Sequence, residues 1–522
     1  MRTVQWILAG VVIGTLAGCG AEEIASPGAG GNVTINNPPA VTPPTVQPPA
    51  GPVLAVAATG CPTIPDPTGL RDDGTITGPT GTYRVCALPA NLAVSTTLEK
   101  IPGLLYALDG RVNVGADRGA APTADAAVVL TIRPGVVIFA KTGTSWLAVN
   151  RGNRINAVGT ATSPIVFTSR DNVLGLANDD SQGQWGGIVL LGRAPVTDCT
   201  VAPAAPPGSV SCERQTEGAV DPAYFGGATP ADNSGTIDYV QVRYSGYVLS
   251  ANSELQSLTL EGAGSATKID HFQSHNSSDD GFENFGGSAS MRHLVITGAD
   301  DDNVDLDTGY QGTIQYVIAV QKTSGAADSM IELDSANALE DQTPRTQLKL
   351  ANFTFVHRNP AAGNGAAMLF RGKADATLVN GVVVSPQPCL RLNGTNILTA
   401  DPATQKLGPP VFKSVVMQCS STGSFVGSGG VTVQQVSDVF NVAGANNNSA
   451  FTASLATVFV NGANETAVVA TDPKTLDAAF DTTTYVGAVK DANDTWYAGW
   501  TCNSATANFG TTGTACASLP SL

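Results

Sequence analysis

Acidic side chains recur at matching positions in a series of similar segments. Aligning Ile269 with Met291 also aligns Glu283 with Asp305. In a strand, the residues on either side of an inward-facing apolar residue face outward. Stacked strands would therefore bring outward carboxylates to roughly 5 Å from one another. The carboxylates expected to meet in this way are Glu283, Asp305, Asp307, Glu332 and Asp334, and the turn before these strands adds Asp301 and Asp302.

Carboxylates at this spacing repel one another, and each raises the pKa of its neighbours. A hard cation would remove the conflict, because Ca²⁺ takes six to eight oxygen ligands. The pattern therefore predicts a Ca²⁺ site or an acid-lined groove for a polymer. The alternative is a solvated acidic face that keeps an exported protein soluble. The sequence leaves both interpretations open.

A second set of outward residues is aromatic or polar. In the strand that begins each unit, an apolar residue is expected to face inward, and the residue before it then faces outward. The outward residues are Tyr239, His271, His293, Tyr316 and Asn352. They could form a platform for sugar rings, with His271 or His293 as a base. We favour a structural ladder instead, because stacks of similar side chains stabilise β-solenoids.

Arg371 and Lys322 are further candidates for catalysis. Arg371 follows the acidic positions, and Lys322 lies on an intervening turn. β-Helix polysaccharide lyases combine acidic Ca²⁺ ligands with a nearby basic residue that abstracts a proton. Such a base needs a lowered pKa or a very close substrate. The sequence has neither a G-x-S-x-G motif nor a phosphate-binding P-loop, so it leaves open whether the protein is an enzyme.

The elements that must position these residues are short strands. Runs such as 128–132 and 187–191 are rich in β-branched residues, and no window shows a sustained helical period. Repeating units of about 20 to 35 residues that are almost all strand predict an all-β fold, a parallel β-helix or solenoid with long loops. The expected divisions are an N-terminal capping region over 61–125, the β-helix over 126–400, and a β-rich continuation and cap over 401–522.

Eight of the nine cysteines fall into four pairs of sequence neighbours. Eight cysteines allow 105 pairings, so counting alone does not fix the connectivity. Local pairing is favoured, because each close pair would staple one loop, and the first and last pairs would staple the ends of the fold. No pair forms C-x-x-C, which disfavours redox or zinc chemistry at these residues. The neighbours are Cys61 and Cys86, Cys199 and Cys212, Cys389 and Cys419, and Cys502 and Cys516.

The ninth cysteine, Cys19, lies at the end of an N-terminal signal. Residues 1–18 hold one positive charge and an apolar run too short to span a membrane, which is typical of a signal peptide. Residues 16–19 (LAGC) resemble the bacterial lipobox. That resemblance implies that Cys19 becomes the lipidated N-terminus, and the neutral Gly20 after it indicates export to the outer membrane. The Pro- and Gly-rich residues 19–60 predict a tether that could reach on the order of 100 Å.

Three internal motifs and a terminal pair resemble a family of bacterial surface lipoproteins. They are 184–190 (QWGGIVL), 224–227 (YFGG), 275–283 (HNSSDDGFE), and 485–488 (YVGA) with 496–500 (WYAGW). The resemblance covers most of residues 125 to 500. It implies a pectate-lyase-like, right-handed parallel β-helix, and it brings no established activity with it.

Together these features predict a lipoprotein displayed at the cell surface that binds a glycan or another extended polymer. The alternative is a Ca²⁺-dependent polysaccharide lyase or depolymerase that acts on the outer face of the β-helix. A structural envelope protein without a small ligand is the third possibility. The net charge of −16 argues against a nucleic-acid partner, which would need a basic face. The membrane is expected to be a partner only through the lipid anchor.

Overall fold

The computed structural model describes residues 53–250, 253–335, 339–361 and 365–520. The predicted signal peptide (1–18), Cys19 and most of the predicted tether (19–60) lie outside the described residues. Residues 54–522 form one compact unit. Among the described residues, no helix is long and apolar enough to cross a membrane.

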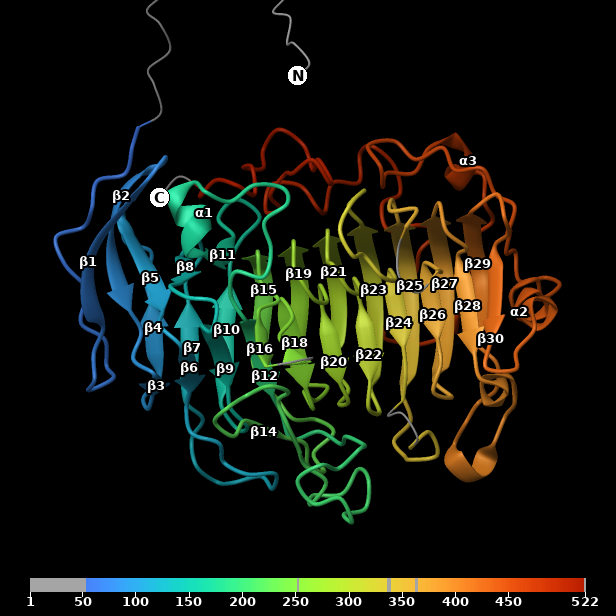
Figure 1. Cartoon of the computed structure of the whole chain (residues 1–522), viewed down its shortest axis with the longest axis horizontal. Coiled ribbons are helices and arrows are strands. Elements are labelled where there is room, and N and C mark those ends of the chain that lie inside the picture. Colours follow the sequence, from blue (N-terminus) through green and yellow to red (C-terminus); the bar gives the residue numbers. More distant parts are fainter. Residues whose placement is uncertain (1–52, 251–252, 336–338, 362–364, 521–522) are drawn as a thin grey trace, which may run out of the picture. The chain divides into compact units, whose positions relative to one another are not determined.

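Two long sheets dominate this unit, and consecutive strands alternate between them over most of the chain (Figure 1). Neighbouring strands within each sheet run parallel, apart from the antiparallel pair β1–β2. A chain that adds one strand to each sheet per turn is a parallel β-helix, because every strand pairs with its counterparts in the turns before and after it. The expected all-β fold is confirmed.

Sheet A holds the longer strands. In order across the sheet they are β1 (Arg71–Gly78), β2 (Gly81–Ala87), β5 (Leu104–Leu108), β8 (Val137–Ala140), β11 (Ile165–Ser169), β15 (Gly235–Arg243), β19 (Lys268–His275), β21 (Ser290–Thr297), β23 (Gln311–Val320), β25 (Gln347–Val356), β27 (Asp375–Val384) and β29 (Val411–Gln418). A short branch of the sheet pairs with β15 and holds β10 (Arg154–Val158), β7 (Val129–Ile132) and β4 (Thr96–Leu98).

Sheet B holds the shorter strands. In order they are β3 (Asn91–Leu92), β6 (Arg111–Val114), β9 (Trp146–Val149), β12 (Gly187–Leu191), β18 (Leu258–Glu261), β20 (Glu283–Phe285), β22 (Asp305–Asp307), β24 (Ile331–Leu333), β26 (Met368–Phe370), β28 (Leu390–Asn393) and β30 (Phe425–Ser428). The parallel pairing thus runs from β2 to β30, and it reaches beyond both ends of the range 126–400 expected for the β-helix.

The hydrophobic core lies between the two sheets. Val240, Phe272 and Leu294 from sheet A and Phe282 and Val304 from sheet B are all buried in it. These are positions that the repeat alignment assigned to the interior. The register follows the same alignment, since Phe272 pairs with Val240 on one side and with Leu294 on the other.

The long strands of sheet A do not alternate strictly. Each strand of this sheet from β15 to β29 bends at one residue with a positive φ, such as His271 (φ 41°) and His293 (φ 50°). Ile269 and Phe272, three residues apart, therefore both face the core. The bend, rather than simple period-2 alternation, turns the intervening side chain outward. The residues at this bend in successive strands are Tyr239, His271, His293, Tyr316, Asn352, Asn380 and Ser414.

All four expected disulfides are present, and each joins cysteines that are neighbours in sequence. Cys61–Cys86 lies near the N-terminal end of the coil, and Cys389–Cys419 lies near the C-terminal end. The other two staple segments outside the sheets. Cys199–Cys212 closes a loop after β12, and Cys502–Cys516 closes the C-terminal segment. The prediction of local pairing is therefore confirmed.

Each end of the coil is covered. The antiparallel partner β1 borders β2 at the N-terminal end. At the C-terminal end, helix α2 (Val433–Phe440) begins with a capping box between Thr432 and Gln435. It packs Phe440 against Phe412 and Phe425 of the last rung, with ring centroids 5.3 and 5.7 Å apart. These contacts shield the open end of the core from water.

Two segments lie over the outer faces of the sheets. Residues 192–234 leave β12 and carry the hairpin of β13 (Arg214–Gln215) and β14 (Tyr224–Phe225), and we call them the covering loop. After β30 the chain returns past α3 (Ala463–Thr466) towards α1 (Arg170–Leu174) near the start of the coil (Figure 1). Beyond β30 the described residues form only isolated bridges and no further strand. The range 401–522, expected to be β-rich, thus contributes β29 and β30 and then leaves the coil.

The remaining short elements lie in the turns. They are the hairpin of β16 (Val248–Ser250) and β17 (Ser253–Glu254) and the 3₁₀ helices η1 (Thr395–Leu398), η2 (Pro402–Thr404) and η3 (Pro473–Thr475).

Candidate functional site

The carboxylates of sheet B stand in register across three successive rungs. Glu283 pairs with Asp305, and Asp305 pairs with Glu332. Asp307 occupies the same rung as Asp305, two residues further along the strand. We call Glu283, Asp305, Asp307, Glu332 and Asp334 the acidic ladder. Its members point away from the core, as expected from their alternation with Phe282, Val304 and Ile331.

Most of the acidic ladder is nevertheless hidden from water. Glu283 is 8% exposed, Glu332 6% and Asp334 3%. The covering loop lies over part of this face and packs Phe225 against Phe285, with ring centroids 6.3 Å apart. The sequence left a solvated acidic face open as an interpretation. The structure shows a mostly buried one, because a segment from an earlier turn folds over the sheet.

The turns that precede the strands bring further carboxylates to the ladder. Three sets of three have ligand oxygens that all lie within 4.8 Å of one another. The sets are Asp279, Asp280 and Asp301; Asp280, Glu283 and Asp305; and Asp301, Asp302 and Asp328. The predicted residues Asp301 and Asp302 are therefore adjacent to the ladder. Asp280 links it to Asp302, whose backbone N–H donates to the Asp280 carboxylate over 2.8 Å.

Burial and mutual repulsion disfavour the charged form of these groups. Burial, followed by the charges of neighbouring acids, raises the pKa of Asp279 to about 7 and that of Asp307 to about 6. Burial also raises the pKa of Glu332 to about 7, although Arg371 opposes the shift. The pKa values of Asp280, Glu283, Asp302 and Asp305 lie well above their ordinary range for the same two reasons. The cluster is thus destabilised at neutral pH unless a cation is present.

Among the described residues, Arg371 is the basic residue that forms ion pairs with the acidic ladder. Its guanidinium lies 2.6 Å from Glu332 and 2.8 Å from Asp334. One arginine cannot neutralise the whole cluster. Oδ1 of Asp305 is buried and has no hydrogen-bond partner in the described part of the chain. Glu283, also buried, forms no ion pair with any other described residue that would offset its charge.

The cluster fits a hard cation. Oxygens within 4.8 Å of one another can contact one ion at the Ca²⁺–oxygen distance of about 2.3–2.6 Å. Asp280, Glu283 and Asp305 form the most suitable set, because it includes the unpartnered oxygen of Asp305. Of the predicted metal ligands, Glu332 and Asp334 are instead held by Arg371, and Asp307 accepts a hydrogen bond from the backbone of Thr308.

The candidate bases are poorly placed for proton abstraction. Burial lowers the pKa of Arg371, but Glu332 and Asp334 outweigh this effect and raise it above the ordinary value. Lys322 lies 2.9 Å from Asp300 and also donates to Gln182, and it is 7% exposed. Both cations are therefore engaged in ion pairs, which is the opposite of what a general base needs.

His271 and His293 stand on the other sheet, in the ladder that we expected to be structural. The ring centroids of Tyr239, His271, His293 and Tyr316 follow one another at 4.1, 4.4 and 4.7 Å, and the rings are nearly parallel. Trp500 packs edge-on against His271, and Trp496 packs against His293. The C-terminal segment thus covers the rings, so they do not form an open platform for sugars.

Next to the acidic ladder lies a polar groove that sequence reasoning missed. Its volume is about 340 Å³, and its lining includes Glu340, Arg371, Asn393 and Asn396. Arg371 belongs to both the groove and the ladder. The same alignment could have located Asn393, because Leu392 pairs with Phe370 and so places Asn393 one rung after Arg371. Nothing local in the sequence marks the groove itself, since Glu340 reaches it from the connection between β24 and β25.

The sequence matches the family described as "Pectate-lyase like beta helix domain" over residues 106–501, which is more than half of the chain. No curated protein and no solved structure matches it significantly. The match agrees with the two parallel sheets and with the inward and outward positions described above. The chain therefore belongs to the family of pectate-lyase-like, right-handed parallel β-helix domains.

Proposed function

We propose that this protein is an exported, lipid-anchored binding protein that holds Ca²⁺ on the outer face of sheet B and uses it to bind an acidic extended glycan. The observation that carries the proposal is the buried acidic ladder, in which one arginine meets many carboxylates. A bound divalent cation would offset their repulsion, and its remaining coordination positions could accept oxygens from the glycan.

A polymer bound at the ladder could extend into the polar groove beside it. The groove is open and polar, and it follows sheet B over the rungs after Arg371. Arg391 stands on the next rung, paired in register with Leu369. Arginine side chains and a Ca²⁺ ion on one face form an arrangement that suits carboxylate groups repeated along a chain.

Binding is favoured over cleavage by the state of Arg371. Its ion pairs with Glu332 and Asp334 keep it protonated. A lyase needs a group that removes a proton next to the uronate carboxyl, and such a group must spend time deprotonated. Arg371 as placed is suited to hold a carboxylate, so the lyase remains the second candidate.

Anchoring at the outer membrane is part of the same proposal. The signal peptide and Cys19 support lipidation, and the Pro-rich tether would set the β-helix away from the membrane. The four disulfides agree with an oxidising compartment. Radiolabelled palmitate should be incorporated into the wild-type chain in cells and not into Cys19→Ala.

A glycan array probed with and without Ca²⁺ tests the binding proposal. Acidic polysaccharides should be retained only with Ca²⁺, and the double variant Glu283→Gln/Asp305→Asn should lose this retention. Asp125→Asn changes an exposed acid outside the cluster and serves as the matched control. Retention that is indifferent to chelator and to the double variant would contradict the proposal.

The same samples separate binding from cleavage. A lyase would generate unsaturated uronates, seen as a rise in ultraviolet absorbance that Arg371→Ala and chelator abolish. A binding protein should retain the polymer with no change in its chain length. Appearance of unsaturated ends would replace binding with the lyase as the function of this face.

A further inference from the structure

A pocket of about 690 Å³ opens on the C-terminal segment, and we call it the C-terminal pocket. Residues 457–458, 497 and 503–511 supply most of its lining, and Arg358 reaches it from the turn after β25. None of these residues belongs to the acidic ladder or lines the polar groove beside that ladder. The volume is in the usual range for sites that bind small ligands, so the pocket is a candidate for a separate binding site.

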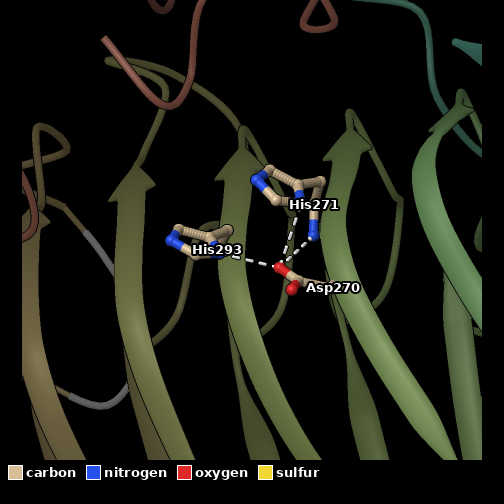
Figure 2. A group of neighbouring side chains, drawn as sticks. All are labelled: Asp270, His271 and His293. Carbon is tan, nitrogen blue, oxygen red and sulfur yellow. Dashed lines mark hydrogen bonds and ion pairs between the residues drawn. The ribbon is translucent and has the colours of Figure 1, made fainter. Parts of the chain in front are cut away.

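The same segment covers the ring ladder of sheet A, where polar atoms already have partners within the fold. Figure 2 shows that His271 and His293 both contact the carboxylate of Asp270. Nδ1 of His293 lies 2.7 Å from Oδ1 of Asp270, and Nδ1 of His271 lies 3.0 Å from Oδ1 of Asp238. Each imidazole thus has a carboxylate partner on the preceding rung, and these contacts do not call for a ligand.

Arg358 differs, because its charge is not balanced within the described part of the chain. Its Nη1 donates to the backbone oxygen of Thr506 over 2.9 Å, and the side chain forms no ion pair with a described residue. Asp179 and Asp180 border the same small hollow as Arg358 without pairing with it. The carboxylate of Asp179 instead accepts from the backbone N–H of Ala505 over 3.1 Å. The remaining N–H groups of Arg358 are therefore available to an anionic ligand.

The rest of the lining combines an aromatic ring with neutral hydrogen-bonding groups. Tyr497 is half-buried, and its hydroxyl forms no hydrogen bond with a described residue. Asn508 and Thr511 are exposed, and they add an amide and a hydroxyl. A sugar ring presents apolar C–H groups bordered by hydroxyls, so it suits a tyrosine, which has an apolar ring and a polar tip, next to such groups.

The wall of the pocket is held in place before any ligand binds. A disulfide closes the loop that carries residues 503–511. Across this loop, Nδ2 of Asn503 donates to the backbone oxygen of Gly510 over 2.8 Å, and its Oδ1 accepts from the backbone N–H of Phe509 over 2.7 Å. Phe509 is buried against Phe459, with ring centroids 5.2 Å apart. Little ordering therefore remains to oppose binding.

We propose that the C-terminal pocket binds one carboxylate-bearing sugar residue, a uronate, with Arg358 holding the carboxylate and Tyr497 contacting the ring. One arginine matches the one carboxylate that each uronate carries, and it does so without a metal ion. The choice of a glycan rests in part on the function proposed above, whereas the site itself uses nothing of the Ca²⁺ site. With one ionic contact the dissociation constant should be on the order of 1 mM, so retention of a polymer on an array still needs the Ca²⁺ site.

The test is saturation-transfer NMR of the full chain in chelator, with trimers of galacturonate, glucuronate and mannuronate as probes. Chelator removes Ca²⁺ from the acidic ladder, so the signal reports on a metal-independent site. At least one trimer should receive saturation, strongest at the C–H groups of its rings. The methyl-esterified form of the same trimer, which lacks the charge, should bind about tenfold more weakly.

Two variants locate the binding. Arg358→Gln removes the charge and should lower the affinity about tenfold, and Tyr497→Leu should weaken the transfer to the sugar C–H groups. The matched control is Arg154→Gln. Arg154 is also an arginine that donates to a backbone oxygen, that of Asn233 over 3.3 Å, but it lies outside the pocket. This control should bind the trimer like the wild type.

The comparison of each trimer with its methyl ester uses the wild-type chain alone, so it does not depend on a folded variant. No binding in chelator, equal binding of the ester, or unchanged binding by Arg358→Gln would overturn the proposal. Binding of inorganic phosphate without any uronate would overturn it as well. Polymer retention with Ca²⁺ but no trimer binding in chelator would reject this pocket alone, and the reverse result would reject only the Ca²⁺-dependent function of sheet B.

Discussion

On the outer face of sheet A, aromatic rings stack at 4.1–4.7 Å from rung to rung, whereas on the outer face of sheet B carboxylates stack in register. Both faces are partly covered, one by the C-terminal segment and the other by the covering loop. The same coil thus places like side chains next to like ones on both faces. For rings this contact is favourable, and for carboxylates it is costly.

The difference identifies the face on which a bound cation would add stability. The rings of sheet A gain from each other and from Trp500, so their ladder can support itself. The carboxylates of sheet B lose hydration and repel one another, and Arg371 offsets only part of the cost. A fold keeps such an arrangement at a functional site more readily than at a structural one.

The largest change in the free energy of unfolding should come from adding Ca²⁺, and this change should depend on pH. The folded-state pKa of Asp279, which lies beside the proposed ligand Asp280, is raised to about 7, so without Ca²⁺ the folded state binds more protons than the unfolded state above about pH 4. Stability therefore falls as pH rises through this window. Each pKa unit corresponds to about 1.4 kcal/mol, so we expect Ca²⁺ to add on the order of 5 kcal/mol at pH 8 and little at pH 5.

Denaturant unfolding with Ca²⁺ or with chelator at several pH values measures this stabilisation. His275 produces the opposite trend, because burial lowers its pKa to about 3 and its neutral form is lost as pH falls. That contribution is present in both series and cancels in the difference. A stabilisation by Ca²⁺ that does not grow with pH would show that the acidic ladder is not where the ion binds.

The next largest change in the free energy of unfolding should come from a substitution over the outer face of sheet A. Trp500 is fully buried, packs edge-on against Tyr239 and His271, and donates from its indole nitrogen to the backbone oxygen of Trp496. Trp500→Ala should cost about 3–5 kcal/mol of unfolding free energy by opening a cavity under the C-terminal segment. Trp500→Phe should cost less.

The response of Trp500→Ala to Ca²⁺ sharpens the comparison. Since the two faces belong to different sheets, the increase in melting temperature on adding Ca²⁺ should match that of the wild type. A variant that loses this increase would show that the faces are coupled through the core, and the two ladders could no longer be treated separately.

Much of this arrangement could be predicted from the sequence, and the rest depends on long-range packing. The alignment of Ile269 with Met291 predicted the register of both sheets, because equivalent residues of successive repeats pair with each other in a β-helix. The close spacing of Cys502 and Cys516 gave the disulfide. Burial of Glu283 could not be foreseen in the same way. It depends on Phe225 meeting Phe285, and no repeat relates those two residues.

The bend in sheet A was also beyond simple pattern reading. Period-2 alternation explains why Phe272 faces inward but not why Ile269 does too. A positive φ is uncommon for any residue other than Gly, so nothing in the local sequence indicates that His271 adopts one. Its cover, Trp500, follows more than 200 residues later, and the contact is fixed by the hydrogen bonds between Gln273 and the backbone of Cys502.

A smaller change in the free energy of unfolding should follow from removing acidic groups on sheet B. Glu283→Gln/Asp305→Asn removes two neighbouring acidic groups, one buried and one half-buried, whose pKa values lie well above the ordinary range. Without Ca²⁺ at pH 8 the double variant should be about 1–3 kcal/mol more stable than the wild type, because removing unpaired buried charge relieves repulsion and desolvation. With Ca²⁺ the order should reverse. A variant that is less stable under both conditions would mean that these carboxylates already have adequate partners.

The smallest effect should come from one ring of sheet A. His293 stacks between His271 and Tyr316, and stacked pairs of this kind contribute about 0.5–1.5 kcal/mol beyond the area that they bury. His293→Ala should lose about this amount in metal-free buffer, whereas His293→Phe should lose little, because the ring stack is kept. Thermal unfolding in chelator measures both. If His293→Phe lowers the stability as much as His293→Ala does, then the hydrogen bond between His293 and Asp270, and not the ring stack, stabilises this ladder. Both faces would then depend on charged groups.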